Sequence, residues 1–127
     1  MVETGEVSAW ANIGADRRQA ERKVFRALAE LRLPDQQVLG VRTFDISVGG
    51  IGVVSPLNLR LESFCHVKVR APLLGMGMDV LKLHARVVHS VLSAKESGFM
   101  LGLEFADPPP AVVSLIKQFI TTASWMR

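Results

Sequence analysis

The sequence has one cysteine, no tyrosine and no run of about 18 consecutive apolar residues. Because a lone cysteine cannot form an internal disulfide, Cys65 excludes a disulfide-stabilised scaffold and fits a reducing compartment. The missing apolar run means that no membrane-spanning helix is expected. Residues 1–15 carry no basic segment followed by an apolar stretch, so no signal peptide is expected either. These absences predict a cytoplasmic protein that does not insert into membranes.

The composition is that of one soluble domain. The chain has 127 residues, of which 49% are hydrophobic and 21% charged. This length is enough for one core and too short for two, and the balance argues against disorder. Ten glycines and six prolines favour a turn-rich fold over a helix bundle.

The formal net charge is +3, and ten of the fifteen basic residues are arginine. A guanidinium presents a planar fork that fits phosphates and guanine edges. Five basic residues fall within ten positions: Arg17, Arg18, Arg22, Lys23 and Arg26. An anionic partner is therefore one hypothesis, and an ordinary solvated charged face is the other.

Apolar periodicity predicts a mainly β protein. Strands are expected at residues 38–46, 51–54, 64–71, 80–91 and 99–105, with a hairpin connection at 74–78. Residues 16–33 match both a helical and a strand period, so their structure stays open. Asp107 and the three prolines after it resemble a helix start, with Asp107 as the cap. We expect a small six-stranded antiparallel, Greek-key-like β-barrel with a C-terminal α-helix.

The histidines do not indicate a metal site. Neighbours Cys65 and His66 point to opposite faces of a strand, as do His84 and His89. The spacing of these residues matches no structural zinc motif. No metal or cofactor is therefore expected.

Ser47 does not match a hydrolase nucleophile, because Asp45 stands where that motif needs glycine. The plain interpretation of 45–50 is a turn in which Asp45 and Ser47 bind backbone donors and Gly49 and Gly50 adopt positive φ. Gly75-Met76-Gly77 is only half of a dinucleotide motif. With no catalytic constellation, the protein is predicted not to be an enzyme.

Two motifs together resemble the PilZ domain family, whose members bind the bacterial second messenger cyclic di-GMP. The first is Arg18-x3-Arg22, preceded by Arg17, and the second is Asp45-x-Ser47-x2-Gly50. Residues 99–107 resemble the last strand of that family and 115–120 its terminal helix. The resemblance implies a PilZ-like domain at 16–127. Residues 1–15 mix small and polar residues around Trp10 and are expected to form an N-terminal arm.

A second arginine register, Arg22-x3-Arg26, overlaps the first. The family usually has a hydrophobic residue inside this motif; Phe25 would supply one in the second register, whereas the first register offers Ala20. The lead-in Asp16-Arg17-Arg18 favours the first register. Only Arg22 belongs to both.

The resemblance implies a non-enzymatic receptor. Its ligand residues would be Arg17, Arg18, Arg22, Asp45, Ser47, Gly49 and Gly50. The arginines can donate paired hydrogen bonds to phosphate or to guanine O6 and N7, and a carboxylate can accept from guanine N–H groups. Gly49 and Gly50 would let the backbone approach the ligand. Ligand-induced ordering of the N-terminal segment would then pass a signal to a partner protein, with motility, biofilm or exopolysaccharide synthesis as outputs.

Two alternatives are kept. One is a PilZ-like adaptor that does not bind the nucleotide and acts through protein contacts. The other is a basic barrel for single-stranded nucleic acid, which would need exposed aromatic rings to stack bases. With no tyrosine in the chain, DNA binding is not expected. A monomer and a homodimer are both compatible with the sequence.

Overall fold

A computed structural model describes residues 21–73 and 77–125 of the chain. The expected arm at 1–15, Arg17 and Arg18 lie outside these ranges, and so does part of the 74–78 connection. The described residues form the following strands and helix: β1 Lys23–Val24, β2 Leu28–Arg32, β3 Val38–Ile46, β4 Gly50–Ser55, β5 Phe64–Ala71, β6 Asp79–Ser93, β7 Gly98–Phe105 and α2 Pro110–Trp125.

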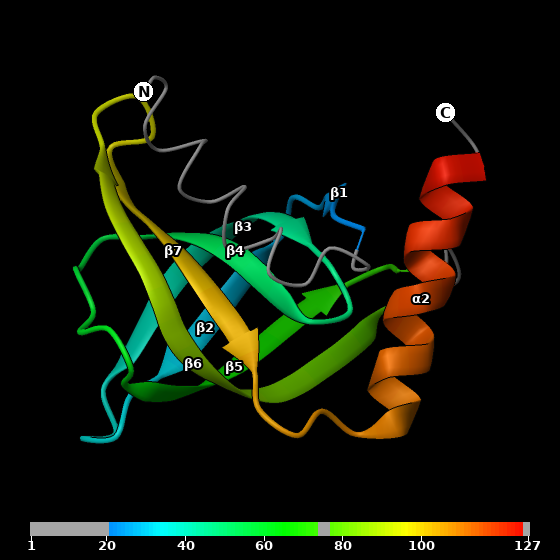
Figure 1. The fold of residues 1–127 in the computed structure, drawn as a ribbon, viewed down its shortest axis with the longest axis horizontal. Helices are drawn as coiled ribbons and strands as arrows, with labels where there is room; N and C mark the ends of the chain where they lie inside the picture. The colour runs from blue at the N-terminus through cyan, green and yellow to red at the C-terminus, as the bar shows by residue number, and fades with distance from the viewer. Residues whose placement is uncertain (1–20, 74–76, 126–127) are drawn as a thin grey trace.

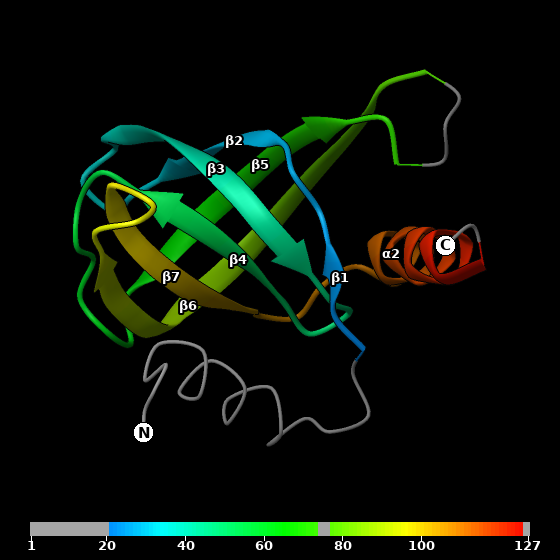
Figure 2. The same ribbon diagram turned by 90° about the horizontal axis from the view of Figure 1, so that it is seen from above.

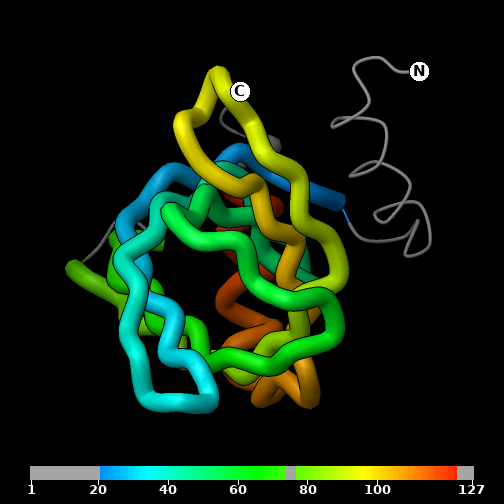
Figure 3. Tube along the Cα trace, turned by 90° about the vertical axis from the view of Figure 1, so that its left-hand side faces the viewer, coloured from blue at the N-terminus to red at the C-terminus, as the bar shows by residue number. Residues whose placement is uncertain are grey.

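The strands form one closed antiparallel barrel. They are hydrogen-bonded in the order β1-β3-β2-β5-β6-β7-β4, and an additional β3–β4 pairing closes the barrel. Six strands therefore make the closed wall, and the two-residue β1 is added to the end of β3. Figure 3, seen along the barrel, shows the strands as a ring with α2 behind it. The predicted fold class is confirmed.

Side-chain alternation explains why these segments are strands. In β5 every second residue, beginning with Cys65, is buried, and the residues between them are exposed. The ambiguous segment 16–33 forms strands in its described part. The period-two pattern prevails there because β2 pairs with β3 on one side and β5 on the other, which satisfies its backbone polar groups.

Helix α2 lies across one end of the barrel (Figures 1 and 2). Its buried residues Ile116 and Ile120 join the barrel core. The helix begins at Pro110, where a missing N–H costs nothing. The expected cap at Asp107 is wrong: that residue has a φ of 51°, and the carbonyl of Pro109 accepts the N–H groups of Val112 and Val113 instead.

In the described part of the chain, no helix is long and apolar enough to cross a membrane.

Candidate functional site

The two predicted motifs meet at the end of β3. In the β1–β3 pair, Lys23 lies opposite Ile46 and Val24 opposite Asp45. This short pairing brings Arg22, the residue before β1, beside the β3–β4 turn. Residues 23 positions apart in sequence thus become neighbours.

Arg22 and Asp45 form a two-point ion pair. The Nε and Nη2 atoms of Arg22 each donate to one carboxylate oxygen of Asp45, both at 3.0 Å. Nη1 of Arg22 also donates to the Oγ of Ser47 at 3.4 Å. The Arg22 and Asp45 side chains keep 21% and 16% of their exposure, so the pair is reachable from solvent but fixed in direction.

Ser47 organises the turn between β3 and β4. Its Oγ accepts the backbone N–H groups of Gly49 and Gly50, each at 3.2 Å, and its own N–H donates to the Gly50 carbonyl at 2.9 Å. The turn interpretation is therefore right for the serine. Asp45, by contrast, pairs with an arginine from another segment. The expected positive φ at Gly49 and Gly50 is wrong, because Gly77 is the positive-φ glycine of the described residues.

Two glycines of β4 are required because neighbouring atoms lie too close to their backbone for a side chain to fit. A Cβ on Gly50 would lie 2.3 Å from the carbonyl oxygen of Leu103 in β7, so only glycine fits. A Cβ on Gly52 would lie 2.5 Å from the Phe44 ring and 2.6 Å from Oδ1 of Asp45. Gly52 therefore leaves the space in which the Asp45 carboxylate is held.

The segment between β1 and β2 is attached to β3 through a buried hydroxyl. The Oγ1 of Thr43 donates to the Phe25 carbonyl at 2.5 Å and accepts the Ala27 N–H at 2.8 Å. The Phe25 ring packs edge-on against Phe119 of α2, with ring centroids 5.4 Å apart. The backbone that carries Arg22 is thus connected both to β3 and to the terminal helix.

Sequence reasoning missed Thr43, Phe25 and Gly52 as parts of this arrangement. A polar residue at an inward position of β3 and a second glycine inside β4 were available signals. Their partners come from other strands, so the sequence pattern could not say what they contact.

The described residues bear on the two arginine registers. Arg22, common to both, is the arginine beside Asp45 and Ser47. Arg26 is exposed, and Phe25 between them is a core residue. Arg18 lies outside the described residues. The assignment of ligand-binding residues stays a prediction.

The sequence predicted that the cysteine and the histidines do not form a metal site. Cys65 is buried and His66 exposed, on opposite faces of β5. His66 and His84 are cross-strand neighbours whose rings stack at 4.7 Å. Within residues 21–73 and 77–125, no three His, Cys, Asp or Glu side chains gather as a possible metal site.

A six-stranded barrel with one helix across its end defines a class of small β-barrel domains. A family model described as "PilZ domain" matches residues 16–122, which is most of the chain. The chain therefore belongs to the PilZ domain family. PilZ domains are receptor domains and not enzymes, in agreement with the expectation from sequence.

Solved structures share the fold at low sequence identity. The inhibitor of motility MotI/DgrA of Bacillus subtilis is 19% identical, with a TM-score of 0.75, and the match covers 87% of this chain and 53% of that one. YcgR of Escherichia coli, solved with c-di-GMP, is 19% identical, with a TM-score of 0.71, and the match covers 87% and 47%. The chain thus spans about half the length of these two proteins.

The PilZ domain of YcgR alone, also solved with c-di-GMP, is similar over nearly its whole length. It is 20% identical, with a TM-score of 0.62, and the match covers 84% of this chain and 90% of that one. No curated protein sequence matches the chain.

Proposed function

We propose that this protein is a non-enzymatic receptor for cyclic di-GMP, which it binds at the corner formed by Arg22, Asp45, Ser47 and the Gly49-Gly50 turn, with Arg17 and Arg18 as further contacts. The observation that carries the proposal is the two-point pairing of Arg22 with Asp45, which joins the two motifs. Membership of the PilZ family supports it, as do family structures that contain c-di-GMP.

The chemistry of the corner suits a cyclic dinucleotide. The ion pair holds both side chains beside the β3–β4 turn before the ligand arrives. A ligand phosphate, or the O6 and N7 of a guanine, can take over the guanidinium from Asp45. The carboxylate then becomes an acceptor for guanine N–H groups, and the buried Ser47 keeps the turn in shape.

The receptor would pass its signal to a partner protein through the arginine segment. Phe25, three residues after Arg22, packs on Phe119, so a displacement of this segment reaches α2. Ligand binding would order the residues around the arginines, because a dianion offsets their mutual repulsion. Hydrogen exchange at residues 10–30 should slow on saturation, and unchanged exchange there would contradict this switch. Motility, biofilm and exopolysaccharide control are the candidate outputs.

The binding experiment is calorimetric titration with cyclic di-GMP at near-physiological salt, with GTP and cyclic GMP as controls. We expect selective binding with a Kd of about 1 to 10 μM or lower. Its stoichiometry separates one ligand from a stacked pair. The absence of both heat and a thermal shift at high ligand concentration would favour the adaptor that does not bind the nucleotide.

Variants then test the site. Arg22→Ala and Asp45→Ala should each weaken binding by about tenfold to a hundredfold, because each removes a charge-assisted contact. Arg26→Ala is the matched control, since it removes an exposed arginine four positions away. If Arg22→Ala and Asp45→Ala both leave the affinity unchanged, the site is wrong. A loss with Arg26→Ala equal to that with Arg22→Ala would identify the second register.

A further inference from the structure

A cluster of basic side chains lies on the outer faces of β2, β5 and β6. We call it the basic groove and define it by Arg32, His66, Lys68, Arg70, Lys82 and His84, all of which are exposed. The strand register places these residues next to each other across the sheet. Lys68 is directly opposite Lys82, and His66 lies between Arg32 and His84.

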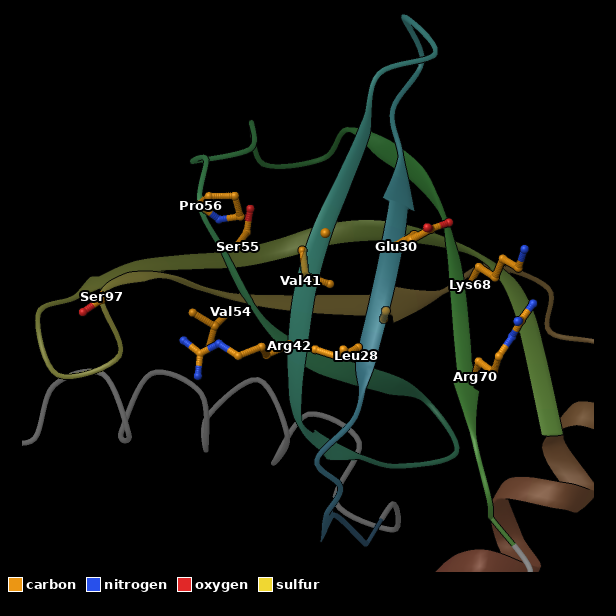
Figure 4. A pocket seen from close by; sticks show the side chains of 12 residues that line it. Leu28, Glu30, Val41, Arg42, Val54, Ser55, Pro56, Lys68, Arg70 and Ser97 are labelled. Carbon is orange, nitrogen blue, oxygen red and sulfur yellow. The ribbon is translucent and has the colours of Figure 1, made fainter. Parts of the chain in front are cut away.

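This surface is hollowed and not flat. A hollow of about 650 Å³ opens over the outer face of β2 and β3 and is lined by Gly40, Glu30, Lys68 and Arg70 (Figure 4). The absence of a side chain at Gly40 creates part of this space. A second hollow of about 320 Å³ also has Glu30 and Lys68 in its lining. The two hollows therefore adjoin at Glu30 and Lys68.

The groove carries positive charge that the described residues do not neutralise. The ion pairs between described residues involve Arg22, Lys23, Arg42 and Arg86. Within the described part of the chain, no carboxylate forms an ion pair with Arg32, Lys68, Arg70 or Lys82. Glu30 lies opposite Lys68 in register without forming an ion pair with it. Because like charges directly opposite each other destabilise a sheet, the Lys68–Lys82 pair is unfavourable for folding alone. A bound anionic group would offset this cost.

The ring geometry indicates which kind of anion fits. The rings of His66 and His84 stack at 4.7 Å, and those of Phe64 and His84 at 5.1 Å. These contacts cover the ring faces that Phe64, His66 and His84 turn toward one another, which leaves fewer free faces for a nucleic-acid base. The charged ends of the groove are the exposed guanidinium and ammonium side chains of Arg32, Lys68, Arg70 and Lys82. Guanidinium and ammonium groups bind carboxylates, whereas single-stranded nucleic acid needs free aromatic faces for its bases. A hollow also fits an extended chain better than a planar bilayer.

From this geometry we propose that the basic groove docks an acidic, extended segment of a partner protein. The groove lies on β2, β5 and β6, whereas the motif corner lies at β1 and the β3–β4 turn. The two proposals are therefore independent. If cyclic di-GMP does not bind, the proposal for the basic groove still stands. If the acidic segment does not bind, the proposal for the motif corner still stands.

The test uses fluorescence anisotropy with labelled probes. An extended chain rises about 3.3 Å per residue and strands lie about 4.8 Å apart, so a peptide of about ten residues, about 33 Å long, is more than long enough to cross the three strands of the groove. The probes are an alternating Glu-Asp peptide of that length, a Ser-Gly peptide, an oligothymidylate of similar charge, and vesicles of phosphatidylcholine with phosphatidylglycerol. We expect the acidic peptide to bind most tightly and the Ser-Gly peptide not to bind.

A matched pair of double variants locates the binding. Lys68→Gln with Lys82→Gln removes two groove charges, and Lys95→Gln with Lys117→Gln removes two exposed charges elsewhere. The groove variant should bind the acidic peptide about tenfold more weakly, and the control less than about threefold. The groove variant should keep or raise its Tm, because it removes a like-charge pair.

Three results would overturn the proposal. The first is that the full-length protein does not bind the acidic peptide. The second is an equal loss in the two double variants, which would indicate general charge attraction. The third is tighter, groove-dependent binding of the oligothymidylate or the vesicles, which would assign the surface to nucleic acid or lipid.

Discussion

The β2–β5–β6 wall and the motif corner are built on different physical principles. In the wall, apolar side chains alternate with exposed polar ones, and burial holds the strands together. In the corner, the central contacts are hydrogen bonds that Arg22 and Thr43 donate and Ser47 accepts, each with a specific partner. Burial of apolar surface is non-directional, so the wall tolerates changes that preserve volume. Hydrogen bonds depend on the position of single atoms, so the corner should not tolerate small changes.

The largest effect on stability is expected in the wall. Leu31 in β2 is fully buried, so Leu31→Ala should lower the free energy of unfolding by about 3 kcal/mol through the cavity it leaves. Denaturant unfolding measures this loss. Leu28→Ala, at an outward position of the same strand with 75% exposure, should change stability by less than about 0.5 kcal/mol. Similar losses in both variants would contradict the assigned inner and outer faces.

The second prediction concerns pH and the wall residue Cys65. Burial raises the pKa of its thiol from 9.0 to about 11. The unfolded thiol therefore loses its proton at a lower pH than the folded one, and stability falls as the pH rises from 9 to about 11. The expected loss is about 2 to 3 kcal/mol by denaturant unfolding across that window. Cys65→Ala should lack this part of the pH dependence, and equal curves for the two proteins would refute the assignment.

The third prediction separates shape from hydrogen bonding in the corner. Thr43→Val keeps the volume but leaves the Phe25 carbonyl and the Ala27 N–H without the hydroxyl. Stability should fall by about 2 kcal/mol, and cyclic di-GMP should bind more weakly because the segment carrying Arg22 is less fixed. Thr43→Ser restores the hydroxyl and should recover most of the ligand affinity in a titration. If the Thr43→Val protein binds cyclic di-GMP as tightly as the unchanged protein does, the hydroxyl does not position the segment that carries Arg22.

The smallest effect is expected where the corner meets α2. A double-mutant cycle with Phe25→Leu and Phe119→Leu should give a coupling free energy of about 1 kcal/mol for this edge-on ring pair. Thermal or denaturant unfolding of the four proteins measures it. Additive single effects would remove the physical link between the arginine segment and the helix.

Much of the fold followed from local pattern. The strand expected at 38–46 coincides with β3, and those expected at 64–71 and 99–105 coincide with β5 and β7 within one residue. The segment of β5 alternates clearly between apolar and polar residues, whereas those of β3 and β7 are mainly apolar segments next to turn signals. The segment 16–33 could not be decided, because its apolar residues satisfy both periods, and in its described part only pairing with β3 and β5 selects strand β2. The cap at Asp107 failed because the prolines after it move the helix start to Pro110.

The candidate site was predictable as a pair of motifs but not as an arrangement. The resemblance of the two motifs to the PilZ family placed Arg22, Asp45 and Ser47 together in one hypothesis. The sequence does not contain the two-point pairing of Arg22 with Asp45, the Thr43 bridge or the space left by Gly52, because each depends on a partner from a different segment.

The sequence by itself determined the strand periodicity, the apolar face of the final helix and the family to which the chain belongs. These properties depend on the order of residue types along the chain. Only the tertiary structure decided that Arg22 meets Asp45, that Phe25 meets Phe119, and that Lys68 and Lys82 face each other above a hollow. Pairing of β1 with β3, packing of α2 on the end of the barrel and the register of β5 with β6 fix these three contacts. Each depends on how separate elements are placed in space, which the order of residue types does not state.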